Sequence, residues 1–224
     1  MPDQALFPGR HVRSARERLL EAMLIVSGER GYEHISVQDV IERAAASRAT
    51  FYKNFDDKED CFAQAYSGGA EWLYRRLIGL AKRQPTWREG LRAGLAELLE
   101  FCANQPALAR ALLVEPHAAG GAALAEHDRL MERLSHAIDG ARREIPSRQK
   151  APPPVTAPFM VGAIETLVRT KLMSDEPETA PEMLPGLLHF VVMQFYGEDA
   201  AWEELTSAPL ATWASRREAA TRIP

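Results

Sequence analysis

The sequence SVQDVIERAAASRATFYKNFDDK, residues 36–58, decides the fold of this chain. It predicts two short helices joined by a turn of three to four residues, which is the spacing of a helix-turn-helix. Ser36 fits the N-cap of the first helix, and Ser47 fits the N-cap of the second, residues 48–55. The apolar side chains of the first helix recur on one face, at Val37, Val40, Ile41 and Ala44.

The second helix has an apolar face and a polar face. Phe51 and Phe55 are four residues apart and can point inward together. The outward set is Arg48, Ala49, Thr50, Tyr52, Lys53 and Asn54. A helix in the DNA major groove reads bases mainly with its first turn, where an arginine binds a guanine edge and methyl groups contact thymine. The remaining polar side chains can reach phosphates, and Lys58, in the first turn of the next helix, adds a phosphate site.

This run resembles the DNA-binding domain of the tetracycline-repressor (TetR) family of bacterial transcription regulators. The resembling residues are Ser36-Val37, Asp39-Val40, Ala44, Ser47, Thr50-Phe51-Tyr52, Asn54-Phe55 and Lys58. Two positions depart from the family pattern: Ala45 stands where the turn usually has glycine, and Cys61 stands where an apolar residue is usual. An alanine at the turn costs up to about 1 kcal/mol if its φ is positive. The close match covers residues 10–66, and beyond it only length and helical layout agree.

The resemblance implies a homodimer in which the last two main helices of each subunit build a four-helix interface. By position, those helices are residues 159–173 and 181–196. It also implies a small-molecule effector held in the C-terminal bundle. A dimer would present two recognition helices about 34–36 Å apart to a pseudo-palindromic operator in double-stranded DNA.

Composition narrows the class of protein. The chain has 224 residues, a net charge of -4 and a pI near 5.9, and residues 1–60 hold nine Lys/Arg against eleven Asp/Glu. We therefore expect few phosphate contacts per subunit and a modest salt dependence. No apolar run approaches the ~20 residues of a membrane span, and the N-terminus has no apolar signal core, so we expect a cytoplasmic protein without a membrane partner.

Motifs for catalysis or cofactor binding are missing from the sequence. It has no G-x-S-x-G, P-loop or dinucleotide fingerprint, and its six histidines form no E-x-x-H or H-x-x-x-H pair. The two cysteines form no C-x-x-C and are not expected to form a disulfide. The sequence thus predicts no enzyme, no cofactor and no metal site.

The fold expected is all-α, with a three-helix head and a C-terminal bundle used for dimerisation and ligand binding. Residues 1–11 lack periodicity and are expected to be a flexible arm; residues 12–58 form the helix-turn-helix domain, and residues 59–224 the effector-binding and dimerisation domain. A capping box at Ser14 and Glu17 opens the first helix, which Gly31 ends. The tail from residue 197 has room for a short added helix.

Candidate effector contacts are large or polar side chains within the apolar helices. They are Trp72, Trp87, Phe101, His136, Glu165 and Arg169. Each has a simpler interpretation, because the aromatic side chains fit a core and Glu165 and Arg169 can pair with each other at i,i+4 on one helix.

The function predicted is a dimeric DNA-binding transcriptional regulator, a repressor that a small-molecule effector releases from its operator. The residues facing bases or nearby phosphates are Ser47, Arg48, Ala49, Thr50 and Lys53, and those holding the DNA backbone are Ser36, Gln38, Tyr52, Asn54 and Lys58. Activation would follow equally well from the same contacts. The alternative from another class is an α-helical interaction protein whose head docks a protein, which the acidic pI favours.

Overall fold

A computed structural model describes residues 14–145 and 150–206 of the chain. Within these ranges every regular element is a helix, as the periodicity predicts. The predicted arm, residues 1–11, and the tail beyond residue 206 lie outside the described residues. Among the described helices, none combines the length and the apolar composition that crossing a bilayer requires.

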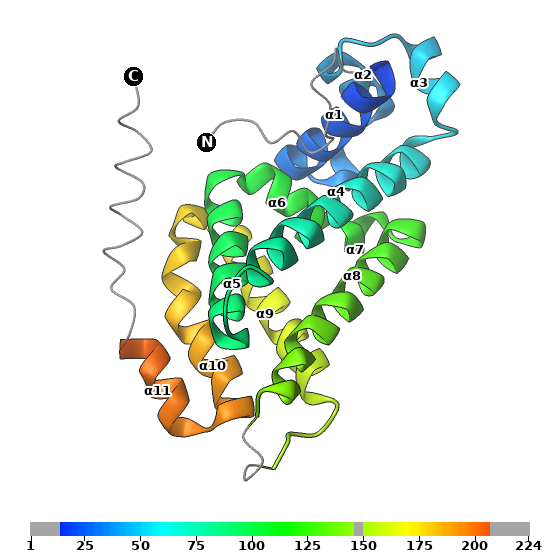
Figure 1. The fold of residues 1–224 in the computed structure, drawn as a ribbon. Coiled ribbons are helices and arrows are strands. Elements are labelled where there is room, and N and C mark those ends of the chain that lie inside the picture. The colour runs from blue at the N-terminus through cyan, green and yellow to red at the C-terminus, as the bar shows by residue number, and fades with distance from the viewer. Residues whose placement is uncertain (1–13, 146–149, 207–224) are drawn as a thin grey trace.

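The predicted three-helix head is confirmed. It consists of α1 (Ala15–Arg30), the short 3-10 turn η1 (Tyr32–His34), α2 (Val37–Arg43) and α3 (Arg48–Asn54), at the upper right of Figure 1. The Ser14–Glu17 capping box opens α1, because the Ser14 hydroxyl accepts from the Glu17 N–H while the Glu17 carboxylate accepts from the Ser14 N–H. Ser36 and Ser47 cap α2 and α3 as predicted.

Helix α4 (Lys58–Ala81) leads from the head into the bundle, and Asp57 is its N-cap (Figure 1). It packs on α1 at the head end and on α5 and α8 further along. Gly69 lies at its closest approach to its neighbours, because a Cβ there would meet Leu112 Cδ2 at 2.6 Å and Leu24 Cδ1 at 3.2 Å. The helix therefore joins head and bundle through a tightly packed contact.

The bundle contains seven further α-helices among the described residues. They are α5 (Trp87–Asn104), α6 (Pro106–Leu113), α7 (Glu115–Ala119), α8 (Gly121–Asp139), α9 (Thr156–Leu172), α10 (Leu184–Tyr196) and α11 (Glu198–Thr206), with 3-10 turns η2 (Gly140–Arg143) and η3 (Pro177–Met183). Helix α6 packs on α1 and α11 packs on α10. The core runs from the head through α4 into the bundle without interruption.

The two helices expected at the dimer interface have different bounds in the structure. The helix expected at 159–173 is α9, Thr156–Leu172. The helix expected at 181–196 begins at Leu184, because residues 177–183 form a 3-10 turn with Pro181 inside it. The short helix expected in the tail is present as α11.

Candidate functional site

Helix α3 presents a polar face to solvent. Phe51 and Phe55 are 0% and 2% exposed and anchor the helix to the head. Around them, Ser47, Arg48, Ala49, Tyr52 and Lys53 are exposed, while Thr50 and Asn54 are half-buried. The predicted outward set therefore lies on one accessible face, at the end of the head furthest from the bundle (Figure 1).

Local contacts order this face without neutralising its charge. The Arg48 guanidinium lies 5.6 Å from the centre of the Tyr52 ring, a cation–π distance. The Ser47 hydroxyl accepts from the Thr50 N–H at 3.0 Å, and the Asn54 amide donates to the Thr50 carbonyl at 2.7 Å. Within the described residues no carboxylate pairs with Arg48 or Lys53, so both cations remain available to an anionic partner.

The turn between α2 and α3 has a left-handed residue, as the TetR resemblance implies. Ala45 has φ 48°, the single positive φ of a non-glycine residue in the described ranges. The alanine thus adopts a backbone conformation that glycine adopts at a lower cost in free energy. Ile41 and Ala44 are buried just before the turn, and the Ala46 N–H donates to the Ile41 carbonyl at 3.0 Å across it.

Of the residues predicted to hold the DNA backbone, Ser36 and Gln38 are exposed on α2. The Ser36 hydroxyl donates to Asp39 at 2.6 Å, and this bond, together with the ion pair to Arg30, holds the pKa of Asp39 well below its usual range. Gln38 donates to Glu42 at 2.9 Å.

Lys58 has a structural partner that its motif position did not predict. Its ammonium donates to the carbonyls of Tyr32 and Ile35 at 3.0 and 3.1 Å, and it lies 4.1 Å from the centre of the Tyr32 ring. Two of its three N–H groups are therefore used to join the start of α4 to the head.

A cavity of about 280 Å³ lies within the bundle, between α4, α5, α8 and α9. Its walls are mostly leucine, isoleucine, valine and glycine, and the polar exceptions are Lys82, Arg143 and Glu165. This volume is close to the lower end of the range for small-molecule sites, about 300–1,000 Å³. Lys82 lies at the C-terminal end of α4, 16 residues or about 24 Å of helix beyond Tyr66. Tyr66 is near Glu165, because the ring of His127 lies within hydrogen-bond distance of both side chains. The cationic and anionic side chains thus line different ends of the cavity.

Two of the six predicted effector contacts, Trp87 and Glu165, line this cavity. The Trp87 indole N–H donates to the Ala137 carbonyl at 3.2 Å, which fixes the ring in the wall. The Glu165 carboxylate lies 2.9 Å from the His127 ring nitrogen, and this hydrogen bond is the largest cause that lowers the pKa of Glu165.

The other four predicted contacts do not line the cavity. Phe101 is a buried core residue, and the partly buried Trp72 packs against it edge to face, with ring centres 5.5 Å apart. His136 is exposed on the outer face of α8, and Arg169 lies one turn beyond Glu165 outside the lining. Periodicity identified the apolar helices but not which side of each faces the hollow, and Lys82 and Arg143 carried no signal of their own.

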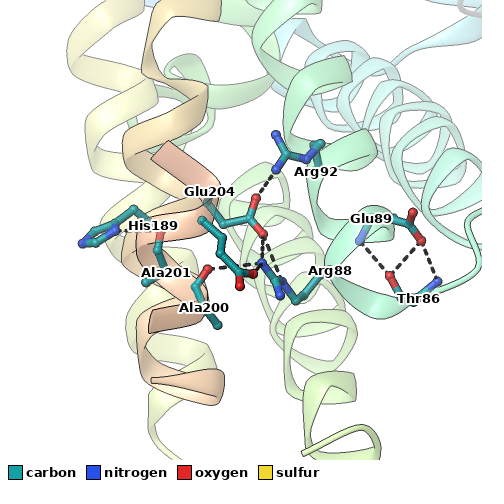
Figure 2. A network of polar contacts seen from close by, with 9 residues as sticks. Thr86, Arg88, Glu89, Arg92, His189, Ala200, Ala201 and Glu204 are labelled. Carbon is teal, nitrogen blue, oxygen red and sulfur yellow. Dashed lines mark hydrogen bonds and ion pairs between the residues drawn. The ribbon is translucent and has the colours of Figure 1, made fainter. Parts of the chain in front are cut away.

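Helix α11 is anchored to the wall of the cavity by a buried carboxylate (Figure 2). The Glu204 side chain is 4% exposed and pairs with Arg88 of α5 at 2.6 Å and with Arg92 through its second oxygen. Arg88 also donates to the Ala200 carbonyl at 3.2 Å. His189 of α10 is 2.9 Å from the Ala201 carbonyl, so its ring is bonded within its own chain. Because α5 carries Trp87 next to Arg88, α11 helps to hold one side of the cavity in place.

Comparison with known proteins supports the class that the fold and these surfaces define, a helix-turn-helix protein with a helical C-terminal domain. Residues 19–65 match the family model described as bacterial regulatory proteins, tetR family. The chain therefore carries the N-terminal domain of that family and resembles the tetR-family transcription regulators. The comparison with curated protein sequences gives no match.

Solved structures extend the likeness to the C-terminal bundle. The transcriptional regulator FadR from Bacillus subtilis, in complex with stearoyl-CoA, has a TM-score of 0.68 at 19% identity, covering 80% of this chain and 97% of that chain. A TetR-family transcriptional regulator from Pectobacterium atrosepticum has a TM-score of 0.63 at 22% sequence identity, covering 80% of this chain and 93% of that chain. RolR, in complex with resorcinol, has a TM-score of 0.58 at 18% sequence identity, covering 88% of this chain and 94% of that chain. The chain thus has the fold of a tetR-family regulator along most of its length.

Proposed function

We propose that this chain is a cytoplasmic, dimeric transcription repressor that binds a pseudo-palindromic operator through α3 and is released by an effector in the bundle cavity. The observation that carries the proposal is the accessible face of α3, with Arg48 and Lys53 unpaired by acids among the described residues. Ser47, Ala49 and Thr50 complete the first turn, which is the part of a recognition helix that meets base edges. Ser36, Gln38, Tyr52, Asn54 and the third N–H of Lys58 would hold phosphates.

The outer face of α9 supports the dimer. Phe159 is 67% exposed and Leu167 is 47% exposed, which is unusual for such large apolar side chains on a helix that also faces the core. Pairing of this face with its copy, together with α10, would bury them. Two recognition helices related by a two-fold axis would then meet successive major grooves.

The effector we propose is an elongated apolar molecule with one anionic group. The leucine-rich walls of the cavity favour an apolar body, and Lys82 and Arg143 at one end favour a carboxylate or phosphate. The structural likeness to a FadR bound to stearoyl-CoA is compatible with such a ligand. A coupling of 1–3 kcal/mol, which is common between two sites, would weaken operator binding about 5- to 150-fold.

Selection of bound fragments from random DNA tests the DNA-binding part of the proposal, because the recovered half-sites report both the dimer spacing and the bases read by α3. On the selected operator, Arg48→Ala should lose about 1–3 kcal/mol of binding free energy and relax the preference at one base pair. Arg129→Ala removes an equally exposed guanidinium from α8 and should bind like the wild type. Equal affinity of both variants for the operator would refute base reading by Arg48.

A thermal-shift series tests the effector. Medium-chain carboxylates should raise the melting temperature more than alcohols of the same chain length, because only the carboxylates can pair with Lys82 and Arg143. In Arg143→Ala the difference between the two series should shrink, whereas Arg129→Ala should keep it. An unchanged preference in Arg143→Ala would remove that guanidinium from the effector site.

A further inference from the structure

Three potential metal ligands from three different helices meet beside the cavity. They are His117 of α7, His127 of α8 and Glu165 of α9, and one ligand atom from each lies within 4.8 Å of the other two. The Nε2 atoms of His127 and His117 lie 2.9 and 3.7 Å from the same carboxylate oxygen, Oε1 of Glu165. The two imidazole rings pack edge to face in a T-shaped arrangement, with their centres 4.9 Å apart.

The turn between α7 and α8 makes this convergence possible. Gly120 and Gly121 both have positive φ, 63° and 50°, so the chain reverses there and places the His117 ring against the His127 ring. His127 is 2% exposed and the Glu165 side chain 18%, whereas the His117 side chain is 39% exposed. The cluster therefore has two largely buried ligands and one accessible ligand, and an ion can reach it from the side of His117.

A second contact orients the buried imidazole. His127 Nδ1 lies 2.9 Å from the hydroxyl of Tyr66, a fully buried side chain. When Nδ1 carries the proton and donates it to Tyr66, the lone pair of Nε2 points at the cluster. Metal-binding histidines have such a partner on their second nitrogen, because it fixes both the tautomer and the ring orientation.

We propose that His117, His127 and Glu165 form a site for a divalent cation of the Zn²⁺ type. Two imidazoles with one carboxylate suit Zn²⁺ and its transition-metal neighbours, whereas Mg²⁺ and Ca²⁺ prefer oxygen ligands throughout. Three protein ligands leave a fourth position for water or for a donor atom of a bound molecule. Since Glu165 also lines the cavity, the site borders the end of the cavity opposite Lys82 and Arg143.

Helix α7 connects this site to the head. Glu115, two residues before His117 and 8% exposed, accepts a hydrogen bond from the Tyr32 N–H at 2.6 Å. The Tyr32 carbonyl in turn holds Lys58 at the start of α4. Ligation of His117 would restrain α7 and, through Glu115, the position of η1 in the head. This regulatory step, unlike the cation site itself, rests on the proposed DNA-binding function.

The cation site is tested by titrating chelator-treated protein with Zn²⁺ against a chromogenic competitor. The wild type should bind one Zn²⁺ per chain at the cluster, and His117→Ala should bind it at least about tenfold more weakly. Tyr66→Phe, which keeps the three ligands, should weaken binding by about 10- to 100-fold. His136→Ala removes an exposed histidine from α8 outside the cluster and should match the wild type.

Circular dichroism melting of each variant separates lost ligation from lost folding. If a folded His117→Ala binds Zn²⁺ as tightly as the wild type, or if His136→Ala loses as much affinity, the site is refuted. Operator binding with and without Zn²⁺ then tests the coupling, for which we expect at least a fivefold change that His117→Ala abolishes. An operator affinity that Zn²⁺ leaves unchanged overturns the coupling, whereas a wild type that binds Zn²⁺ but no DNA overturns the proposed function and leaves the cation site standing.

Discussion

Replacement of Ala45 by glycine should stabilise the head, against the usual effect of glycine. Ala45 has φ 48°, and the left-handed conformation costs an L-residue with a Cβ roughly 1–2 kcal/mol. Glycine avoids that cost but loses about 0.5–1 kcal/mol more backbone entropy on folding. The Ala45 methyl group is exposed, so its removal forfeits little burial. The expected net change is a stabilisation of about 0.5–1 kcal/mol.

The matched control is Ala49→Gly, because Ala49 is also an exposed alanine of the head but lies inside α3. There glycine should destabilise by about 0.5–1 kcal/mol. For a domain of 150–250 residues, 1 kcal/mol shifts the melting temperature by about 2–4 °C. Melting followed by circular dichroism should therefore move up by about 1–4 °C for Ala45→Gly and down by a similar amount for Ala49→Gly. A drop for both variants would refute the assigned backbone conformation of the turn.

Three further predictions follow from burial, the cavity and the capping of α2. Glu204→Ala should lower the free energy of unfolding in urea by about 1–3 kcal/mol. The loss should be smaller than for a fully buried ion pair, because the Arg88 side chain is 30% exposed. Glu203→Ala is the control, since the Glu203 side chain is 64% exposed, and it should change the free energy of unfolding by no more than about 0.5 kcal/mol. Gly94→Met should raise the melting temperature, because glycine inside a helix costs about 1 kcal/mol of stability. The methionine side chain should also fill the cavity and so abolish the rise in melting temperature caused by the effector. If that rise is retained, the effector binds elsewhere. Asp39 has a depressed pKa, so its contribution to stability is fully present above its ordinary pKa near 4 and is lost as the pH falls further. The stability gap between wild type and Asp39→Asn in urea should therefore narrow steadily below about pH 4, and a constant gap would contradict this.

The helix-turn-helix was predictable because its signals are local. Ser36 and Ser47 each satisfy an N–H within three residues, and Phe51 and Phe55 share a face through helical geometry alone. The departure at Ala45 was likewise visible as an alanine at a turn position that favours glycine. The same reasoning could not find the structural role of Lys58, because its carbonyl partners lie 23 and 26 residues earlier in the chain.

The lining of the cavity was predictable only in part. Trp87 and Glu165 were identified as unusual residues within apolar helices, but so were Trp72 and Phe101, which pack against each other. Side-chain type cannot distinguish the wall of a cavity from a filled core, because both are apolar and both recur with helical period. The difference depends on how closely neighbouring helices approach.

The sequence by itself determined the all-helical class, the head and the residues that α3 exposes to solvent, since capping and periodicity act over three to seven residues and need no distant partner. Only the tertiary structure decided where the bundle is hollow, how Glu204 is buried between two arginines, and that His117, His127 and Glu165 meet. A motif such as H-x-x-x-H detects ligands carried by one helix, whereas here each ligand comes from a different helix. Their meeting depends on the packing of α7, α8 and α9, a long-range property that no short stretch of sequence specifies.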